Sequence, residues 1–191
     1  MRKHIANRFK EVTYEIDLRV KDYDFCKTFS LLIARVLNKR VKEPKRIKDG
    51  RWKVYYKSVA FYEWAKKFKT SFEDNLEELS KYIEYNKETV RYFLRGLFDA
   101  EGTNSRNKQL FLYDSNKTLL EYAKYLLERY FNIRVIGPRL LYRAGTIKKK
   151  KNGKIIVSKQ DIYCIGISRY ADIIKFLKQI GFSISRKQIG S

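Results

Sequence analysis

Two acidic residues follow a stretch that otherwise has the pattern of an amphipathic helix. In RYFLRGLFDAEGT (91–103), apolar residues recur at helical spacing, and Asp99 and Glu101 come just before Gly102. The carboxyl end of a helix carries partial negative charge, so an acid there costs about 0.3 kcal/mol or more. Two interpretations are open: a solvated helix end, or a site where a cation and a phosphate make these acids favourable.

The scarcity of other metal ligands narrows the chemistry of such a site. The chain has one histidine, His4, and two cysteines, Cys26 and Cys164. Zinc sites need clusters of cysteine and histidine. The two cysteines lie in apolar contexts, so we expect buried free thiols in a cytoplasmic protein rather than a disulfide. Metal chemistry would therefore use carboxylates, which suit Mg²⁺ or, in its place, Mn²⁺.

The composition favours a polyanionic partner. The 191 residues include 43 lysines and arginines against 21 aspartates and glutamates, a formal net charge of +22, and 44% of them are hydrophobic. Nucleic acid is the first candidate for the partner. An anionic membrane surface ranks second, because no basic amphipathic helix with a clean apolar face dominates. No apolar run approaches transmembrane length and the N-terminus is no signal peptide, so we expect no membrane partner and a cytoplasmic location.

The chain repeats itself. NKRVKEP (38–44) and NIRVIGP (132–138) share Asn, Arg, Val and Pro at an offset of 94 residues (132 − 38), and they contain the only two prolines. The same offset aligns the apolar positions of the two helices that are expected just before these segments, 25–37 and 119–131. Matches of both kinds at one offset indicate an internal duplication.

Each copy is predicted to have the same elements in the same order. A strand (11–21 or 108–114) is followed by a helix, two more strands and a closing helix. Asn152-Gly153 predicts the tip of a basic β-ribbon that is inserted in the second copy. We expect a first copy over 1–70, a linker helix over 71–86 and a complete second copy over 87–191.

The first copy has no visible counterpart of the helix with the two acids. Shifted by 94 residues, Leu94 to Gly102 falls at positions 0 to 8, where MRKHIAN has no similar pattern. We therefore expect the first copy to begin at its second strand. Its leading helix and first strand are missing or lie before Met1.

The segment LRGLFDAEG (94–102), within this repeat, resembles the LAGLIDADG motif of homing endonucleases. The resemblance covers nearly the whole chain. It implies an α+β fold of two pseudo-symmetric α-β-β-α-β-β-α repeats, the first truncated at its N-terminus, with the sheets forming a saddle for DNA. It also implies Mg²⁺-dependent hydrolysis of DNA phosphodiester bonds, with divalent metals held by the last acids of two motif helices packed side by side.

The resemblance implies roles for particular residues. Glu101 is expected to be the catalytic carboxylate and metal ligand, and Asp99 the structural acid of the motif. Basic residues near the metal site in the family suggest Lys21 and, after the closing helix, Arg186 and Lys187. In the second copy, Asp114 and Ser115 hold the place of Lys21, a departure from the usual basic residue.

The motif helix is expected to pack against a partner helix through Gly96, Leu94 and Leu97. A glycine inside a helix costs about 0.5–1 kcal/mol relative to alanine, and close approach of another backbone is a reason to keep it. If the first copy supplies no such helix, two chains could pair in a homodimer that brings two Glu101 side chains together.

Outward faces of the strands are expected to contact double-stranded DNA. The expected residues are Arg19, Lys21, Arg51, Lys53, Tyr55, Lys57, Arg139, Arg143, Lys148, Lys149, Lys150 and Lys151. Ordinary solvated charge is the alternative for each lysine. Glu15 and Asp17 share a face with Arg19, so they would accept from cytosine amino groups or point past the DNA.

Three functions fit these observations. The leading hypothesis is a site-specific double-stranded DNA endonuclease of the homing type, impaired if the first motif helix is absent. The main alternative is a non-cleaving nucleic-acid-binding protein on the same scaffold: an intron RNA maturase, a regulator or a decayed endonuclease. The missing first motif helix favours this alternative, because one acid per chain supplies only half of a two-acid metal site. The retained Glu101 favours the enzyme. A ribosome-associated basic protein would explain the charge but not the duplication.

Overall fold

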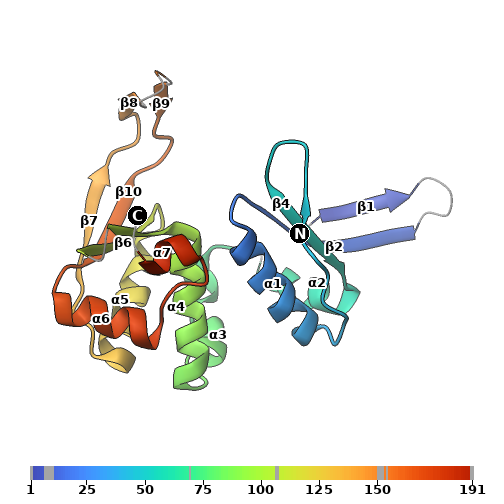
Figure 1. The fold of residues 1–191 in the computed structure, drawn as a ribbon, viewed down its shortest axis with the longest axis horizontal. Helices are drawn as coiled ribbons and strands as arrows, with labels where there is room; N and C mark the ends of the chain where they lie inside the picture. The colour runs from blue at the N-terminus through green and yellow to red at the C-terminus, as the bar shows by residue number, and fades with distance from the viewer. Residues whose placement is uncertain are drawn as a thin grey trace. The chain divides into compact units, whose positions relative to one another are not determined.

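Residues 1–71 and 72–191 form two separate units, here unit 1 and unit 2, in the computed structural model of the chain (Figure 1). The structure describes residues 2–6, 11–68, 70–105, 108–149, 153 and 155–189, with the backbone alone at 2–6, 11–13 and 148. No helix among these residues is long and apolar enough to cross a membrane.

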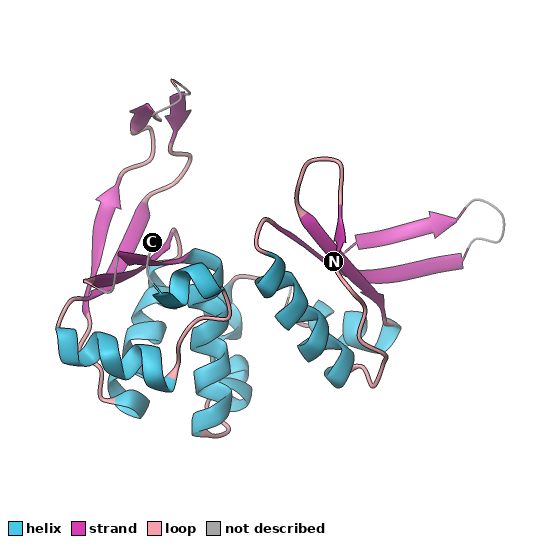
Figure 2. Cartoon of the chain, viewed as in Figure 1, coloured by secondary structure: helices cyan, strands magenta, loops and turns pink. Residues whose placement is uncertain are grey.

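Unit 1 consists of one antiparallel sheet with two helices on one side of it (Figure 2). Its elements are β1 (Arg2–Ala6), β2 (Glu11–Val20), α1 (Tyr23–Val36), β3 (Lys45–Arg46), β4 (Trp52–Lys57) and α2 (Val59–Lys66). The strand order is β1-β2-β4-β3, so the strand that comes first along the chain lies at one edge and the third lies at the other.

Unit 2 repeats this arrangement and adds three helices and a ribbon. Its elements are α3 (Phe72–Ile83), α4 (Lys87–Glu101), β5 (Gly102–Ser105), β6 (Gln109–Asp114), α5 (Lys117–Phe131), β7 (Ile136–Tyr142), β8 (Ile147–Lys149), β9 (Ile155–Val157), β10 (Ile162–Ile167), α6 (Tyr170–Gln179) and α7 (Ser185–Ile189). The sheet order β5-β6-β10-β7 matches that of unit 1, and β8 and β9 form the separate ribbon. The predicted α-β-β-α-β-β-α repeat is confirmed in the run from α4 to α6.

The prediction that the first copy lacks its first strand is wrong. β1 pairs with β2 from Arg2 opposite Glu15 to Ala6 opposite Glu11. In unit 2 the pairing of the equivalent strands, β5 and β6, reaches its turn at Ser105 opposite Gln109. The offset of 94 residues therefore does not align β1 with β5. β1 is also short and rich in basic residues, which hides the alternation of a strand. Among the described residues of unit 1, no element corresponds to α4.

The strand alternation places an apolar core between each sheet and its helices. In unit 1, Ile16 and Val54 are buried with Ala34 of α1. In unit 2, Leu112 and Ile165 are buried with residues of α4, α5 and α6. Since the helices cover one face, the opposite face of each sheet is the open face.

Two further expectations can be compared with the structure. Cys26 and Cys164 are both free and buried, as predicted, and burial raises the pKa of the Cys26 thiol. The segment expected as a linker does contain a helix, α3, and its Phe72, Leu76 and Leu79 pack against the core of unit 2. α3 is therefore part of unit 2.

A buried tyrosine hydroxyl connects three segments of unit 1. Tyr56 of β4 is fully buried. Its hydroxyl lies 2.8 Å from Ser30 Oγ of α1 and accepts a hydrogen bond from the Lys42 main-chain N–H, also at 2.8 Å. The bond to Lys42 holds the segment between α1 and β3.

We predict that Tyr56→Phe lowers the free energy of unfolding of unit 1 by about 1–3 kcal/mol, because buried polar groups lose a partner. Tyr55→Phe is the matched control, since Tyr55 is 40% exposed on the same strand. Urea unfolding followed by tryptophan fluorescence measures this unit alone, because both tryptophans, Trp52 and Trp64, lie in it. Equal midpoints for the two variants would contradict the prediction.

Candidate active site and nucleic-acid interface

Helix α4 begins at a fully formed capping box. Asn86 Oδ1 accepts from the Thr89 main-chain N–H at 2.9 Å, and the Asn86 N–H donates to Thr89 Oγ1 at 3.1 Å. Val90, Leu94 and Phe98 then form a buried stripe along the helix. The cap and the stripe fix where the helix starts and which side faces the core.

The end of α4 is set by a close approach that only glycine permits. A Cβ atom at Gly102 would lie 2.5 Å from the main-chain oxygen of Phe98 and 2.8 Å from its Cα. The backbone φ of Gly102 is −83°, an angle that any residue adopts, so space rather than conformation requires glycine here. The chain passes directly from the last turn of α4 into β5, and Glu101 stays exposed at the junction.

The two acids of the motif have different environments. Asp99 is 3% exposed, and its Oδ1 accepts from the Ser183 main-chain N–H at 2.9 Å. Burial raises the pKa of Asp99, against the lowering effect of bonds from Ser183 and Ile184 and of the Lys187 charge. Glu101 is exposed, and its side chain has no hydrogen bond or ion pair with the other described residues. The predicted structural role of Asp99 is confirmed by its contacts.

Lys187 of α7 caps the carboxyl end of α4. Its Nζ donates to the main-chain oxygens of Asp99 at 2.6 Å and Phe98 at 3.1 Å, and the Asn104 amide donates to the Lys187 main-chain oxygen at 2.7 Å. We expected Lys187 to be a catalytic residue. That expectation is corrected, because the side chain is 8% exposed and its ammonium bonds the last turn of the motif helix.

The residues expected to pack α4 against another helix do not share one surface. Leu94 is fully buried in the core of unit 2, so its assignment to a helix-pairing surface is wrong: it belongs to the stripe that faces its own sheet. Leu97 is partly buried against the same core. Gly96 is exposed, and an added Cβ would meet nothing within 4 Å. Helix pairing at Gly96 stays a prediction.

The open face of the unit 1 sheet carries basic side chains in adjacent strands. Arg19 of β2 lies opposite Lys53 of β4, which in turn lies opposite Lys45 of β3. Two acids of β2 share this face: Arg19 Nε donates to Asp17 Oδ2 at 2.9 Å, and Glu15 lies opposite Lys57 of β4. Arg19, Lys45, Lys53 and Lys57 outnumber these two acids, so the face has a net positive charge.

Other residues expected to contact DNA surround this face. Lys57 and Tyr55 are exposed on β4, and Lys21 is exposed just after β2. Arg51 Nε donates to Asp49 Oδ2 at 2.9 Å, and this bond lowers the pKa of Asp49. Sequence reasoning missed Lys42, whose Nζ lies 4.3 Å from the centre of the Tyr55 ring.

In unit 2, a β-bulge directs Arg139 to the open face. Ile136 and Arg139 of β7 lie opposite Gly166 and Cys164 of β10, so three steps on one strand match two on the other. Arg139 and Arg143 are exposed. Of the expected ribbon residues, Lys149 is exposed in β8, whereas the Lys148 side chain and all of Lys150 and Lys151 lie outside the described residues.

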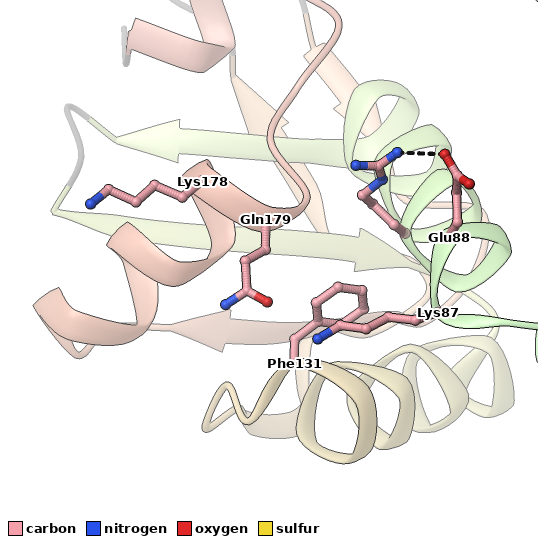
Figure 3. A pocket seen from close by; sticks show the side chains of 6 residues that line it. Lys87, Glu88, Phe131, Lys178 and Gln179 are labelled. Carbon is pink, nitrogen blue, oxygen red and sulfur yellow. Dashed lines mark hydrogen bonds and ion pairs between the residues drawn. The ribbon is translucent and has the colours of Figure 1, made fainter.

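A separate pocket of about 390 Å³ lies beside the first turn of α4 (Figure 3). Two of its three cations are already engaged: Arg91 pairs with Glu88 at 2.9 Å, and Lys87 Nζ lies 5.2 Å from the centre of the Phe131 ring. Since each helical residue advances about 1.5 Å, this pocket lies roughly 20 Å along α4 from Glu101. It is not part of the site at the other end.

Glu101 suits a site in which a metal ion is bound by the protein and by the substrate together. No group of three or more histidine, cysteine or acidic side chains among the described residues could hold a metal ion, so an all-protein cage does not fit. Mg²⁺ commonly keeps several waters and binds one or two carboxylates plus substrate phosphates. An exposed, unpaired carboxylate at a helix end suits that second arrangement.

Comparison with known proteins identifies the scaffold. Residues 88–181 match the model of the LAGLIDADG-like domain family. The structure is similar to that of I-DmoI in complex with DNA and Mn, with a TM-score of 0.56 and 22% identity over 94% of this chain and 87% of that chain. Full-length WhiA from Thermatoga maritima is also similar, with a TM-score of 0.50 and 18% identity over 91% of this chain and 49% of that chain. At these identities the likeness shows the fold alone, and it confirms the expected fold class.

One curated relative aligns over almost the whole chain. An uncharacterized protein of Methanocaldococcus jannaschii is 29% identical over 187 residues, which are 97% of this chain. The chain spans 64% of the length of that relative.

We predict that Lys187→Met weakens the carboxyl end of α4. A bond from a charged donor contributes about 1.5–3 kcal/mol, so the loss of even one of these bonds should make amides in the last turn of α4 and in α7 exchange hydrogen about 10–100 times faster. Hydrogen-exchange mass spectrometry measures this, with Lys178→Met, an exposed lysine of α6, as the control. Protection equal to that of the control would show that Lys187 does not hold this helix end.

Proposed function

We propose that this chain, whose residues 88–181 are a LAGLIDADG-like domain, is a site-specific double-stranded DNA endonuclease with Glu101 as its catalytic carboxylate. The observation that carries the proposal is the contrast at the end of α4. Asp99 is buried and bonded, whereas Glu101 is exposed and has no partner among the described residues. On a chain of net charge +22, an unpaired carboxylate at a helix end weakens phosphate binding unless a cation joins them.

The open faces of the two sheets are the proposed DNA-binding surfaces. The major groove of DNA admits strands as well as helices, and these faces present Arg19, Lys53 and Lys57 in unit 1 and Arg139 in unit 2. Cations along adjacent strands suit the repeated phosphates of a duplex. The same faces offer arginine and tyrosine side chains for contacts to base edges.

The chain's own contribution to cleavage is to place one carboxylate. Glu101 would hold Mg²⁺ or Mn²⁺ together with phosphate oxygens and water. When bound, such an ion lowers the pKa of a water ligand and stabilises charge on the leaving oxygen. Gly102 brings β5 against the last turn of α4, and Lys187 bonds the carbonyls of that turn. The Glu101 backbone is therefore held from both sides.

One observation favours a non-cleaving function on the same scaffold. Within the described residues of unit 1, no element corresponds to α4, so Glu101 has no symmetry-related acid there. A protein with one motif acid could bind duplex DNA or intron RNA without cutting it, since a fold does not determine an activity. This is the second candidate function.

Binding to duplex DNA is predicted to depend steeply on salt. The logarithm of the association constant should fall with log[salt] by about 0.9 per phosphate contact. Lys53→Ala should reduce that slope by about 0.9 at every DNA sequence tested, whereas Lys66→Ala, on a helix of the same unit, should not change it. Fluorescence anisotropy with labelled duplexes measures both. A slope near zero for the unmodified chain, or binding to RNA alone, would remove duplex DNA as the partner.

Glu101→Gln is predicted to abolish cleavage in Mg²⁺ or Mn²⁺ while leaving DNA binding equal or tighter, because it removes one negative charge near phosphate. Glu88→Gln, at the other end of α4, is the control. Sequencing the ends of a randomised duplex library after incubation with each protein measures cleavage. Equal cleavage by Glu101→Gln would exclude the assigned role, and no cleavage by the unmodified chain would favour the second candidate function.

A further inference from the structure

A hollow of about 170 Å³ lies on the open face of the unit 2 sheet. Residues of β6, β7 and β10 line it, and Gly166 belongs to β10, the strand between the other two. The lining residues are Gln109, Phe111, Ile136, Arg139, Gly166 and Ser168. None of them belongs to the catalytic site proposed at the end of α4.

One wall of the hollow lies close over the sheet, because one position in a cross-strand row has no side chain. Phe111 of β6 and Ile136 of β7 both lie opposite Gly166, one on each side. Side chains in such a row point to the same face. A Cβ at Gly166 would lie 3.1 Å and 3.2 Å from two atoms of the Phe111 ring. The ring therefore covers the glycine, the hollow lies beside the ring, and a methyl group added at Gly166 would displace this wall.

Polar groups lie at both ends of the hollow. Arg139 sits at one end, held to the face by the bulge in β7, and a bond with Cys164 raises the pKa of its guanidinium. Gln109 and Ser168 line the other end. The hollow therefore combines an apolar centre with a cation on one side and amide and hydroxyl groups on the other.

We propose that the Gly166 hollow receives the 5-methyl group of one thymine in the major groove of duplex DNA. The methyl group of thymine is the only apolar group that base edges present there. Glutamine suits the adenine edge and arginine suits the guanine edge or a phosphate, so the polar ends fit the surroundings of that methyl group. The inference rests on the proposed function in one respect: DNA must lie against this face of the sheet.

The charge around the hollow fits this occupant. Arg139 and Arg143 are exposed on or just after β7, and the ribbon of β8 and β9 that follows carries the exposed Lys149. A flexible apolar ligand would gain nothing from these cations, whereas a duplex places phosphates on both sides of each base edge. The hollow is thus a specificity-determining site within a surface whose cations contact phosphates and do not distinguish one base sequence from another.

The experiment begins with binding sites selected by the unmodified chain from a randomised duplex library. Each thymine of a selected site is then replaced singly by uracil, which removes the methyl group and keeps the base pair. One replacement should weaken binding by about fourfold, the effect of exposing one buried methyl group, and the others should change it little.

Gly166→Ala tests whether the hollow is the receptor. The added methyl group should remove the discrimination between thymine and uracil at the sensitive position, while Lys178→Ala on α6 should keep it. Circular dichroism and binding to unselected duplexes confirm that each variant is folded. Phe111→Leu, which removes a wall instead of displacing it, should also reduce the discrimination.

The outcomes separate this inference from the proposed function. A single sensitive thymine in the unmodified chain, lost in Gly166→Ala, supports it. It is overturned if no uracil replacement weakens binding, or if the sensitive thymine persists in Gly166→Ala, and in both cases duplex binding and cleavage stand unaffected. Absence of any duplex binding by the unmodified chain would overturn both.

Discussion

The constraint on which the site depends is the contact between the last turn of α4 and the start of β5. The backbone of Gly102 lies so close to Phe98 that any side chain would collide with it. The helix passes into the strand without a loop, and Lys187 of α7 caps its last turn by donating to two main-chain oxygens. Asp99 accepts a hydrogen bond from the main-chain N–H of Ser183, just before α7. The helix end and the C-terminal segment thus hold each other.

This mutual contact explains why two acids two residues apart differ so much. Asp99 faces inward, where burial raises its pKa and main-chain donors satisfy its carboxylate. Glu101 faces outward, where its carboxylate is accessible to a ligand. An exposed acid at the negative end of a helix is unfavourable alone, and a cation shared with phosphate removes the conflict. The unfavourable position of Glu101 in the free chain is therefore consistent with a site in which a cation and a substrate phosphate complete the arrangement.

The two sheets add a second constraint, because each packs its helices on one face only. The charged and aromatic residues that alternate with the core must then lie on the open face, as Lys53 and Tyr55 do in unit 1. Among the described residues, the same face of unit 2 has fewer cations, and it contains the Gly166 hollow. The two copies thus share the architecture of their open faces while the chemistry of these faces differs.

The sequence by itself determined the repeat, the motif helix and the ribbon, because these follow from periodicity and turn residues that involve neighbours along the chain. Only the tertiary structure decided the pairing of β1, whose register is not that of its counterpart, and the burial of Lys187 against carbonyls 88 and 89 residues away. It also decided the bulge that places Arg139 opposite Cys164, and the hollow at Gly166, which requires walls from two other strands. Register and packing depend on contacts between distant segments, and local patterns do not contain them.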